Sequence, residues 1–118
     1  MSNVRQSVSD DERAQLKRLH AALGLFRDIK RTMPLQYVTA FMLVAVDEGL
    51  GVTEYARRAD VSQSVMTRHL LDLGASNRHH EAGYGLVQQK PDPLDRRTTR
   101  TMLTVKGRAL AAKVAHAL

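Results

Sequence analysis

The feature that most constrains the fold of this chain is a pair of short helical segments, separated by a tight turn, within residues 52–73. Thr53 is expected to cap the first helix, which ends at Ala59, and Ser62 is expected to cap the second. Three apolar residues of the second helix recur at the spacing of one helix face and should point inward: Met66, Leu70 and Leu73. The segment therefore predicts a helix-turn-helix, a motif that can place its second helix in the major groove of DNA.

The opposite face of the second helix carries hydrogen-bonding side chains near its amino terminus, the end that approaches base edges and phosphates. Gln63 could bind adenine, and Arg68 could bind guanine or a phosphate. The residues of this segment that we predict to contact DNA are Thr53, Ser62, Gln63, Ser64, Thr67 and Arg68. The alternative for any one of them is an ordinary solvated helix face.

A second candidate site is a hairpin, with strands expected at 86–90 and 98–103 and a turn at 91–97. Its basic residues would reach the DNA backbone or the minor groove, where arginine responds to negative potential: Lys90, Arg96, Arg97 and Arg100. Asp95 is acidic, so we expect it to close the turn or orient an arginine. On the returning strand the side chains expected to point inward are Thr101, Leu103 and Val105. The alternative is a salt-bridged surface hairpin without a ligand.

The charge distribution favours a polyanionic partner for the second half of the chain. The net charge is +6, and residues 52–118 hold eleven Lys or Arg against six Asp or Glu, whereas residues 1–51 hold seven against six. Such an excess attracts nucleic acid or an anionic surface. The absence of cysteine excludes disulfides and thiolate metal sites. With no signal sequence and no apolar run long enough to span a bilayer, we expect a cytoplasmic protein.

The remaining segments predict three more helices. Ser9 and Glu12 form a capping-box pattern that begins the first, and Pro34 stops it. A second, apolar nearly all round, should run from Pro34 to Glu48 as the central core helix, and Thr104 should cap the last. The expected fold class is mainly α with a small β-hairpin, a winged helix-turn-helix. It would form a single domain over 9–118, preceded by a disordered tail at 1–8.

Several of these residues together resemble the multiple-antibiotic-resistance regulator (MarR) family. The resemblance rests on residues 61–68, on Asp95 and Arg97, and on Leu103-Thr104 with the later Gly107. It implies a dimeric regulator, a repressor or an activator, that binds a pseudo-palindromic site in double-stranded DNA. Its recognition helix would lie in the major groove and the wing residue Arg97 in the minor groove. Members of the family often bind a small anionic aromatic effector between the dimer helices and the DNA-binding lobe.

This chain departs from the family pattern in two places. The loop at 75–85 is longer than the usual connector, and the chain ends at Leu118 without the long last helix that members use to dimerise. The dimer surface would then come from the short final helix and from an apolar stripe on the first helix: Leu16, Leu19, Leu23 and Phe26.

Other functions receive less support from the sequence. The neighbours His79, His80 and Glu81 lack a spacing that would make them converge on a metal, so we expect no metal site. We find no phosphate-binding glycine loop, nucleophile elbow or zinc-protease motif, and we expect no enzyme and no cofactor. A winged-helix protein-interaction module without DNA binding remains the alternative, although the outward face lacks the apolar anchors such a surface uses.

Overall fold

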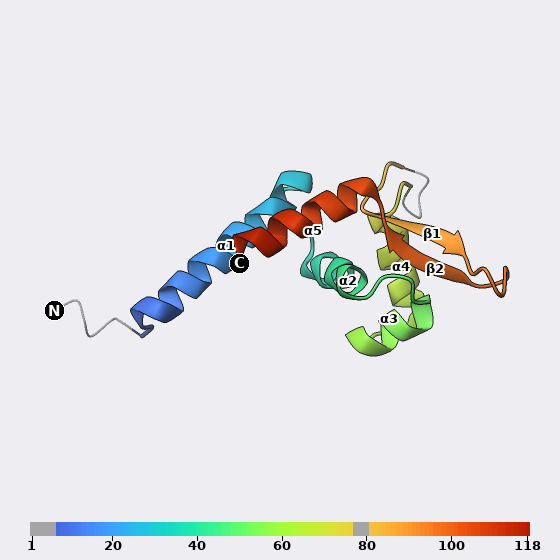
Figure 1. Cartoon of the computed structure of the whole chain (residues 1–118), viewed down its shortest axis with the longest axis horizontal. Helices are drawn as coiled ribbons and strands as arrows, with labels where there is room; N and C mark the ends of the chain where they lie inside the picture. The colour runs from blue at the N-terminus through green and yellow to red at the C-terminus, as the bar shows by residue number, and fades with distance from the viewer. Residues whose placement is uncertain (1–6, 77–80) are drawn as a thin grey trace.

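The computed structural model describes residues 7–76 and 81–118. Within these ranges the chain forms five helices and one antiparallel hairpin (Figure 1). In chain order the elements are α1 (Asp10–Ile29), α2 (Leu35–Val46), α3 (Val52–Ala59), α4 (Gln63–Leu73), β1 (Val87–Pro91), β2 (Thr99–Leu103) and α5 (Val105–Ala117). The predicted mainly α fold with a small hairpin is confirmed.

Helix α1 begins at the predicted capping box. The Ser9 hydroxyl accepts from the Glu12 amide at 3.1 Å, and a Glu12 carboxylate oxygen accepts from the Ser9 amide at 2.8 Å. Two amide groups of the first turn, which lack helical partners, are thereby satisfied. The tail predicted at 1–8 lies outside the described residues apart from its last two. Helix α5 packs along α1, and the first half of α1 projects beyond the end of α5 (Figure 1).

Helix α2 lies at the centre of the domain, as predicted, and contacts α3, α4, α5 and β2. Phe41 is completely buried, and its ring meets that of Phe26 on α1 edge to face, with 5.7 Å between centroids. The expectation of burial all round is wrong at the two ends. Leu35 and Val46 are 67% and 78% exposed, because the first and last turns extend past the elements that cover the middle of the helix.

The helix-turn-helix forms, with one correction to how it begins. Ser62 caps α4 by accepting from the Val65 amide at 3.2 Å, as predicted. The expectation that Thr53 caps α3 is wrong. Helix α3 starts one residue earlier, at Val52, with Gly51 in the capping position, so Thr53 already lies inside the first turn.

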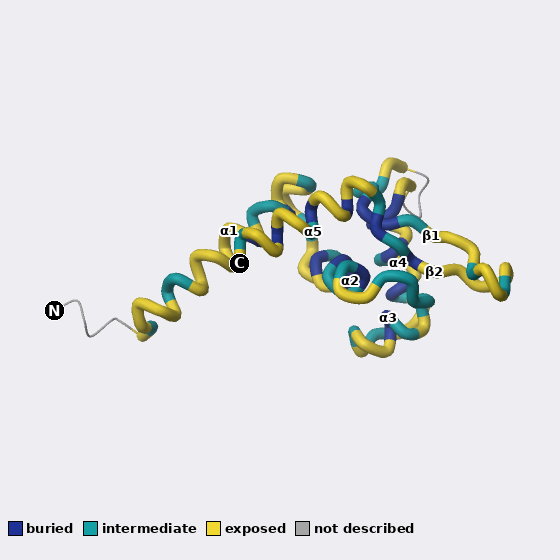
Figure 2. Tube along the Cα trace, in the orientation of Figure 1, coloured by how far each residue is buried: buried dark blue, intermediate teal, exposed yellow. Residues whose placement is uncertain are grey.

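The two strands pair in register with Val87 opposite Leu103 and Pro91 opposite Thr99. Thr101 and Leu103 point inward and are buried, as predicted. The prediction for Val105 is wrong: Thr104 caps α5, so Val105 begins the helix and is 83% exposed. Figure 2 shows burial concentrated around α2, α4 and the base of the hairpin, while the hairpin tip and the first half of α1 are exposed. No helix among the described residues is long and apolar enough to cross a membrane.

Candidate nucleic-acid interface

Helix α4 is seated by one buried face and presents the other to solvent. Met66, Leu70 and Leu73 are at most 3% exposed and belong to the hydrophobic core. The residues predicted to contact DNA on this helix are all exposed: Gln63, Ser64, Thr67 and Arg68. Packing on one side thus fixes the helix, and its polar face stays available for a partner.

Two hydroxyl groups on that face are already used inside the helix. Ser62 supplies the cap, and its Oγ lies 3.2 Å from Oγ of Ser64. Thr67 donates from Oγ1 to the carbonyl oxygen of Gln63 at 2.9 Å. Gln63 and Arg68 therefore have the longest exposed side chains with which α4 could reach base edges.

The hairpin tip is built on Asp95, whose main contacts are internal. Its Oδ1 accepts from the Arg97 backbone amide at 3.1 Å and from Arg97 Nε at 3.2 Å, and its carbonyl oxygen accepts from the Thr98 amide at 3.0 Å. This geometry agrees with the predicted role of Asp95 in closing the turn. The Arg97 side chain is nevertheless 91% exposed, so its guanidinium extends into solvent from a fixed backbone.

A second aspartate, missed by the sequence analysis, supports the same tip. Asp92 Oδ1 accepts from the Leu94 amide at 2.8 Å, and its Oδ2 accepts from Arg100 Nε at 3.1 Å. The backbone hydrogen bond and the Arg100 guanidinium lower the pKa of Asp92. An Asp-Pro pair before a turn is a recognisable turn signal, because aspartate accepts from the amide two residues on.

The four basic residues of the hairpin differ in how many contacts they make within the protein. Arg100 is held by Asp92 and also donates from Nη1 to the Gly49 carbonyl at 3.4 Å. Lys90 lies opposite Arg100 in the strand register, and both are exposed. Arg96 is exposed at the tip beside Arg97. The structure thus brings Lys90, Arg96, Arg97 and Arg100 together on one hairpin.

The long loop before the hairpin closes on itself at its base. The Gly83 amide donates to the Ala75 carbonyl, Gly85 to Gly74, and Leu86 to Leu73, at 2.8–3.0 Å. Strand β1 consequently starts directly against the end of α4, and the extra residues do not separate the hairpin from the helix. His79 and His80, which we discounted as metal ligands, lie outside the described residues. Among residues 7–76 and 81–118 no three His, Cys, Asp or Glu side chains cluster around a possible metal position.

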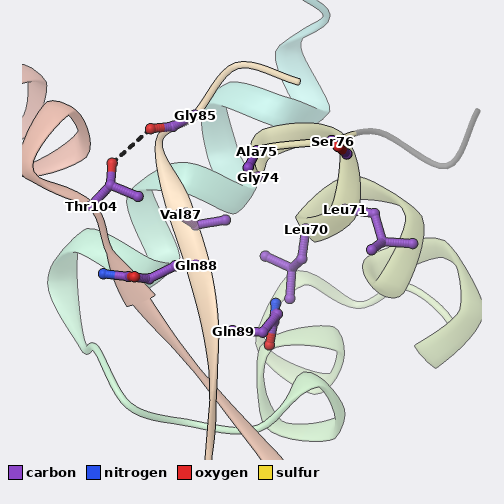
Figure 3. Close-up of a pocket in the computed structure, with 10 residues that line it drawn as sticks. All are labelled: Leu70, Leu71, Gly74, Ala75, Ser76, Gly85, Val87, Gln88, Gln89 and Thr104. Carbon is purple, nitrogen blue, oxygen red and sulfur yellow. Dashed lines mark hydrogen bonds between the residues drawn. The ribbon is translucent and has the colours of Figure 1, made fainter. Parts of the chain in front are cut away.

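A groove of about 360 Å³ opens between α4 and β1 (Figure 3). Leu70, Leu71 and Val87 form its apolar part, and the hydrogen bond from Thr104 Oγ1 to the Gly85 carbonyl, at 2.6 Å, lies at one end. The recognition helix and the hairpin are therefore held to each other at the hairpin base, where Leu86 bonds to Leu73, while a groove separates them farther along.

Helix α3 carries an ion-pair network rather than a free basic face. Glu54 pairs with Arg57 and Arg58, and Arg58 also pairs with Asp47 at 3.0 Å. Hydrogen bonds from the two guanidinium groups lower the pKa of Glu54 to about 2. Thr53 is exposed on the first turn of this helix, where a phosphate could reach it.

The stripe predicted for dimerisation divides in the structure. Leu16, Leu19 and Leu23 are 54%, 47% and 39% exposed along α1. Phe26 does not belong with them, and its assignment to a dimer surface is wrong, because it is 2% exposed and packs on Phe41 within the chain. Three leucines on one helix are thus only partly covered by the described residues of this chain.

Several solved transcription regulators are similar to this chain in structure. A MarR-like transcriptional regulator from Thermotoga maritima is 28% identical and superposes with a TM-score of 0.61, covering 73% of this chain and 55% of that one. The transcriptional repressor CouR, solved bound to a 23-mer DNA duplex, is 25% identical over 99% of this chain and 76% of its own, with a TM-score of 0.60. A mutant of MarR from E. coli, solved with operator DNA, is 16% identical over 89% of this chain and 68% of its own, with a TM-score of 0.63.

The chain has a MarR-type winged-helix fold. In that fold α3 and α4 form the helix-turn-helix and the β1–β2 hairpin is the wing. No protein-family model and no curated protein sequence matches the chain, so the relationship rests on structure together with the residues of the helix and the wing. The chain spans only 55% of the length of the Thermotoga regulator.

Proposed function

We propose that the chain is a sequence-specific, DNA-binding transcription regulator of the MarR type. The observation that carries the proposal is the joint presentation of an exposed polar face on α4 and an arginine-bearing wing beside it. Two proteins that share this fold were solved with DNA, CouR on a 23-mer duplex and a MarR mutant with operator DNA. The basic excess of residues 52–118 lies in the same part of the chain.

In this proposal the two elements have different tasks. Gln63 and Arg68 on α4 bind base edges in the major groove, because amide and guanidinium groups match adenine and guanine. Arg97 enters the minor groove, where it responds to groove width and negative potential. The other residues of the interface contact or approach the phosphate backbone, which fixes the register of the protein on the duplex: Thr53, Ser62, Ser64, Thr67, Lys90, Arg96 and Arg100.

We further infer that the active species is a homodimer. The exposed Leu16, Leu19 and Leu23 along α1 supply an apolar stripe of the spacing used in helix–helix contacts. Two copies would then place their α4 helices about 34–36 Å apart, one turn of DNA. A small aromatic effector has a candidate position in a cavity of about 370 Å³ between the end of α1 and the DNA-binding lobe. The cavity is lined by Lys30, Tyr37 and Tyr84 and also by the acidic residues Asp72 and Glu81.

The decisive experiment is selection of bound sequences from random duplexes with the full chain, combined with a measurement of its mass in solution. We expect a two-part palindromic sequence, a dimeric mass, and an affinity that falls steeply as salt rises, because phosphate neutralisation releases counterions. Selected duplexes that share no common sequence, or an affinity that does not change with salt, would overturn the proposal and favour a protein-interaction module of the same fold.

A further inference from the structure

The connector between α2 and α3, residues 47–50, is bonded to the wing although the two lie about fifty residues apart in the chain. The Gly49 amide donates to the Thr101 carbonyl at 2.8 Å, and the Thr101 amide donates to the Leu50 carbonyl at 3.0 Å. Glu48 adds a third bond, its Oε2 accepting from the Leu103 amide at 2.8 Å. The connector thus lies along β2 and supplies partners to the side of that strand that β1 does not cover.

One side chain of the helix-turn-helix holds this connector. Tyr55 on α3 is completely buried, and its hydroxyl donates to the Asp47 carbonyl at 2.7 Å and accepts from the Leu50 amide at 3.2 Å. These two contacts fall at the two ends of the connector. Burial raises the pKa of Tyr55, which keeps the phenol protonated and able to donate.

The connector also needs a special backbone conformation between those two contacts. Gly49 has φ +89°, a region that side chains rarely adopt. This turn presents the Gly49 amide to Thr101 and its carbonyl to Arg100 Nη1. Because Arg100 also pairs with Asp92 at the base of the hairpin tip, a chain of contacts runs from the buried tyrosine to the part of the wing that carries the arginines.

We propose that Tyr55 is a positioning residue for DNA binding, which sets the angle of the wing relative to α4 through the 47–50 connector. This inference rests on the proposed function and deepens it. Besides the burial of Val87 and Leu103 in the core, the wing is attached by hydrogen bonds at two places: at its base, where Leu86 bonds to Leu73 and Thr104 to Leu86, and at mid-strand, through the connector. A two-stranded hairpin has little stability of its own, so the second attachment determines where Arg97 points.

The contribution of the Tyr55 hydroxyl can be separated from that of the ring. Tyr55→Phe keeps the buried aromatic volume but removes the hydroxyl that accepts from the Leu50 amide and donates to the Asp47 carbonyl. Leaving buried backbone groups without partners costs free energy, so the connector should shift to satisfy them, and β2, which is bonded to it, should shift with it. The wing should then sample several angles, and Arg97 should lose contact with the minor groove for part of the time.

The test is a double-mutant cycle on duplex affinity with the wild type, Tyr55→Phe, Arg97→Ala and the double variant. We expect Tyr55→Phe to weaken binding about threefold to tenfold in the wild-type background and less than about twofold in the Arg97→Ala background, since coupled residues are not additive. Equal losses in both backgrounds would mean that Tyr55 does not act through the wing, and the inference would fall.

Thr39→Val is the control, because Thr39 on α2 also donates its hydroxyl to a backbone carbonyl, that of Gln36 at 3.1 Å, away from the connector and outside the proposed interface. It should show no coupling to Arg97; coupling as strong as that of Tyr55 would point to general destabilisation and count against the proposal. Glu48→Ala, which removes the acceptor for the Leu103 amide, should be non-additive with Arg97→Ala and serves if Tyr55→Phe does not fold.

Hydrogen exchange in the free protein tests the same link without DNA. Tyr55→Phe should speed exchange of the Gly49 and Thr101 amides while the Leu86 amide, at the base of the wing, keeps its protection. Unchanged exchange at Gly49 and Thr101 would overturn the inference. If the wild type binds no duplex but Tyr55→Phe shows the expected exchange pattern, the proposed function is overturned. The role of Tyr55 in holding the connector against the wing is then still confirmed.

Discussion

Helix α4 and the wing are the two parts of the proposed interface, and they are held in place by different forces. Helix α4 is seated by buried apolar side chains, among them Leu70 and Leu73. The wing is buried only at Val87, Thr101 and Leu103, and is otherwise held by backbone hydrogen bonds to the connector and by ion pairs at its tip. Close packing fixes position tightly, whereas exposed ion pairs contribute little to stability. We conclude that α4 is the rigid reference of the interface and that the wing is its adjustable part.

The largest effect should follow from breaking the packing of α4. Leu70→Ala removes a side chain that is 3% exposed, and we expect it to lower the free energy of unfolding by about 2–5 kcal/mol. Leu71→Ala, on the same helix but 40% exposed, is the matched control and should cost far less. Urea denaturation measures both. Equal losses would show that α4 is not held mainly by its buried face.

The next largest effect concerns the base of the wing. A Cβ on Gly107 would overlap the Leu86 carbonyl oxygen, the atom that accepts from the Thr104 amide. Gly107→Ala should therefore destabilise the domain by about 3 kcal/mol, the upper range for overpacking. Gly24→Ala is the control, because a Cβ there meets nothing within 4 Å, and it should stabilise α1 by up to about 1 kcal/mol. A stable Gly107→Ala would mean that the wing base yields easily.

A smaller effect separates the two elements by what they recognise. Arg68→Ala on α4 should lose about 1–2 kcal/mol of discrimination between the selected sequence and its single-base variants. Arg97→Ala on the wing should weaken binding to many sequences alike, with a smaller change in preference. Competition binding against a panel of substituted duplexes measures both. The reverse pattern would assign sequence recognition to the wing.

The smallest effect is a dependence of stability on pH through α3. Pairing with Arg57 and Arg58 lowers the Glu54 pKa to about 2 from a usual value of 4.5. A depressed carboxyl pKa stabilises the fold above the unfolded value and loses that contribution as pH falls from about 4.5 to about 2. The melting temperature of the wild type should therefore exceed that of Glu54→Gln slightly at pH 6, and the gap should close near pH 2. A gap independent of pH would mean that the ion pairs do not stabilise α3.

Local signals in the sequence were sufficient for the helices. Ser9, Ser62 and Thr104 each cap the helix that their position predicted, because a cap depends only on the next three residues. The inward face of α4 also followed from spacing alone. The errors occurred where the same kind of local signal competed with a tertiary contact or with a neighbouring element: Thr53, Phe26 and Val105.

The sequence by itself therefore determined that a helix-turn-helix and an arginine-bearing hairpin are present, since periodicity, caps and turn residues act over a few positions. Only the tertiary structure decided how the wing is aimed. That aim depends on the ladder closing the loop at 75–85 and on hydrogen bonds from Gly49 and Leu50 to Thr101, which join segments far apart in the chain. It depends also on the buried hydroxyl of Tyr55, whose two partners are backbone groups and leave no mark in the pattern of side chains.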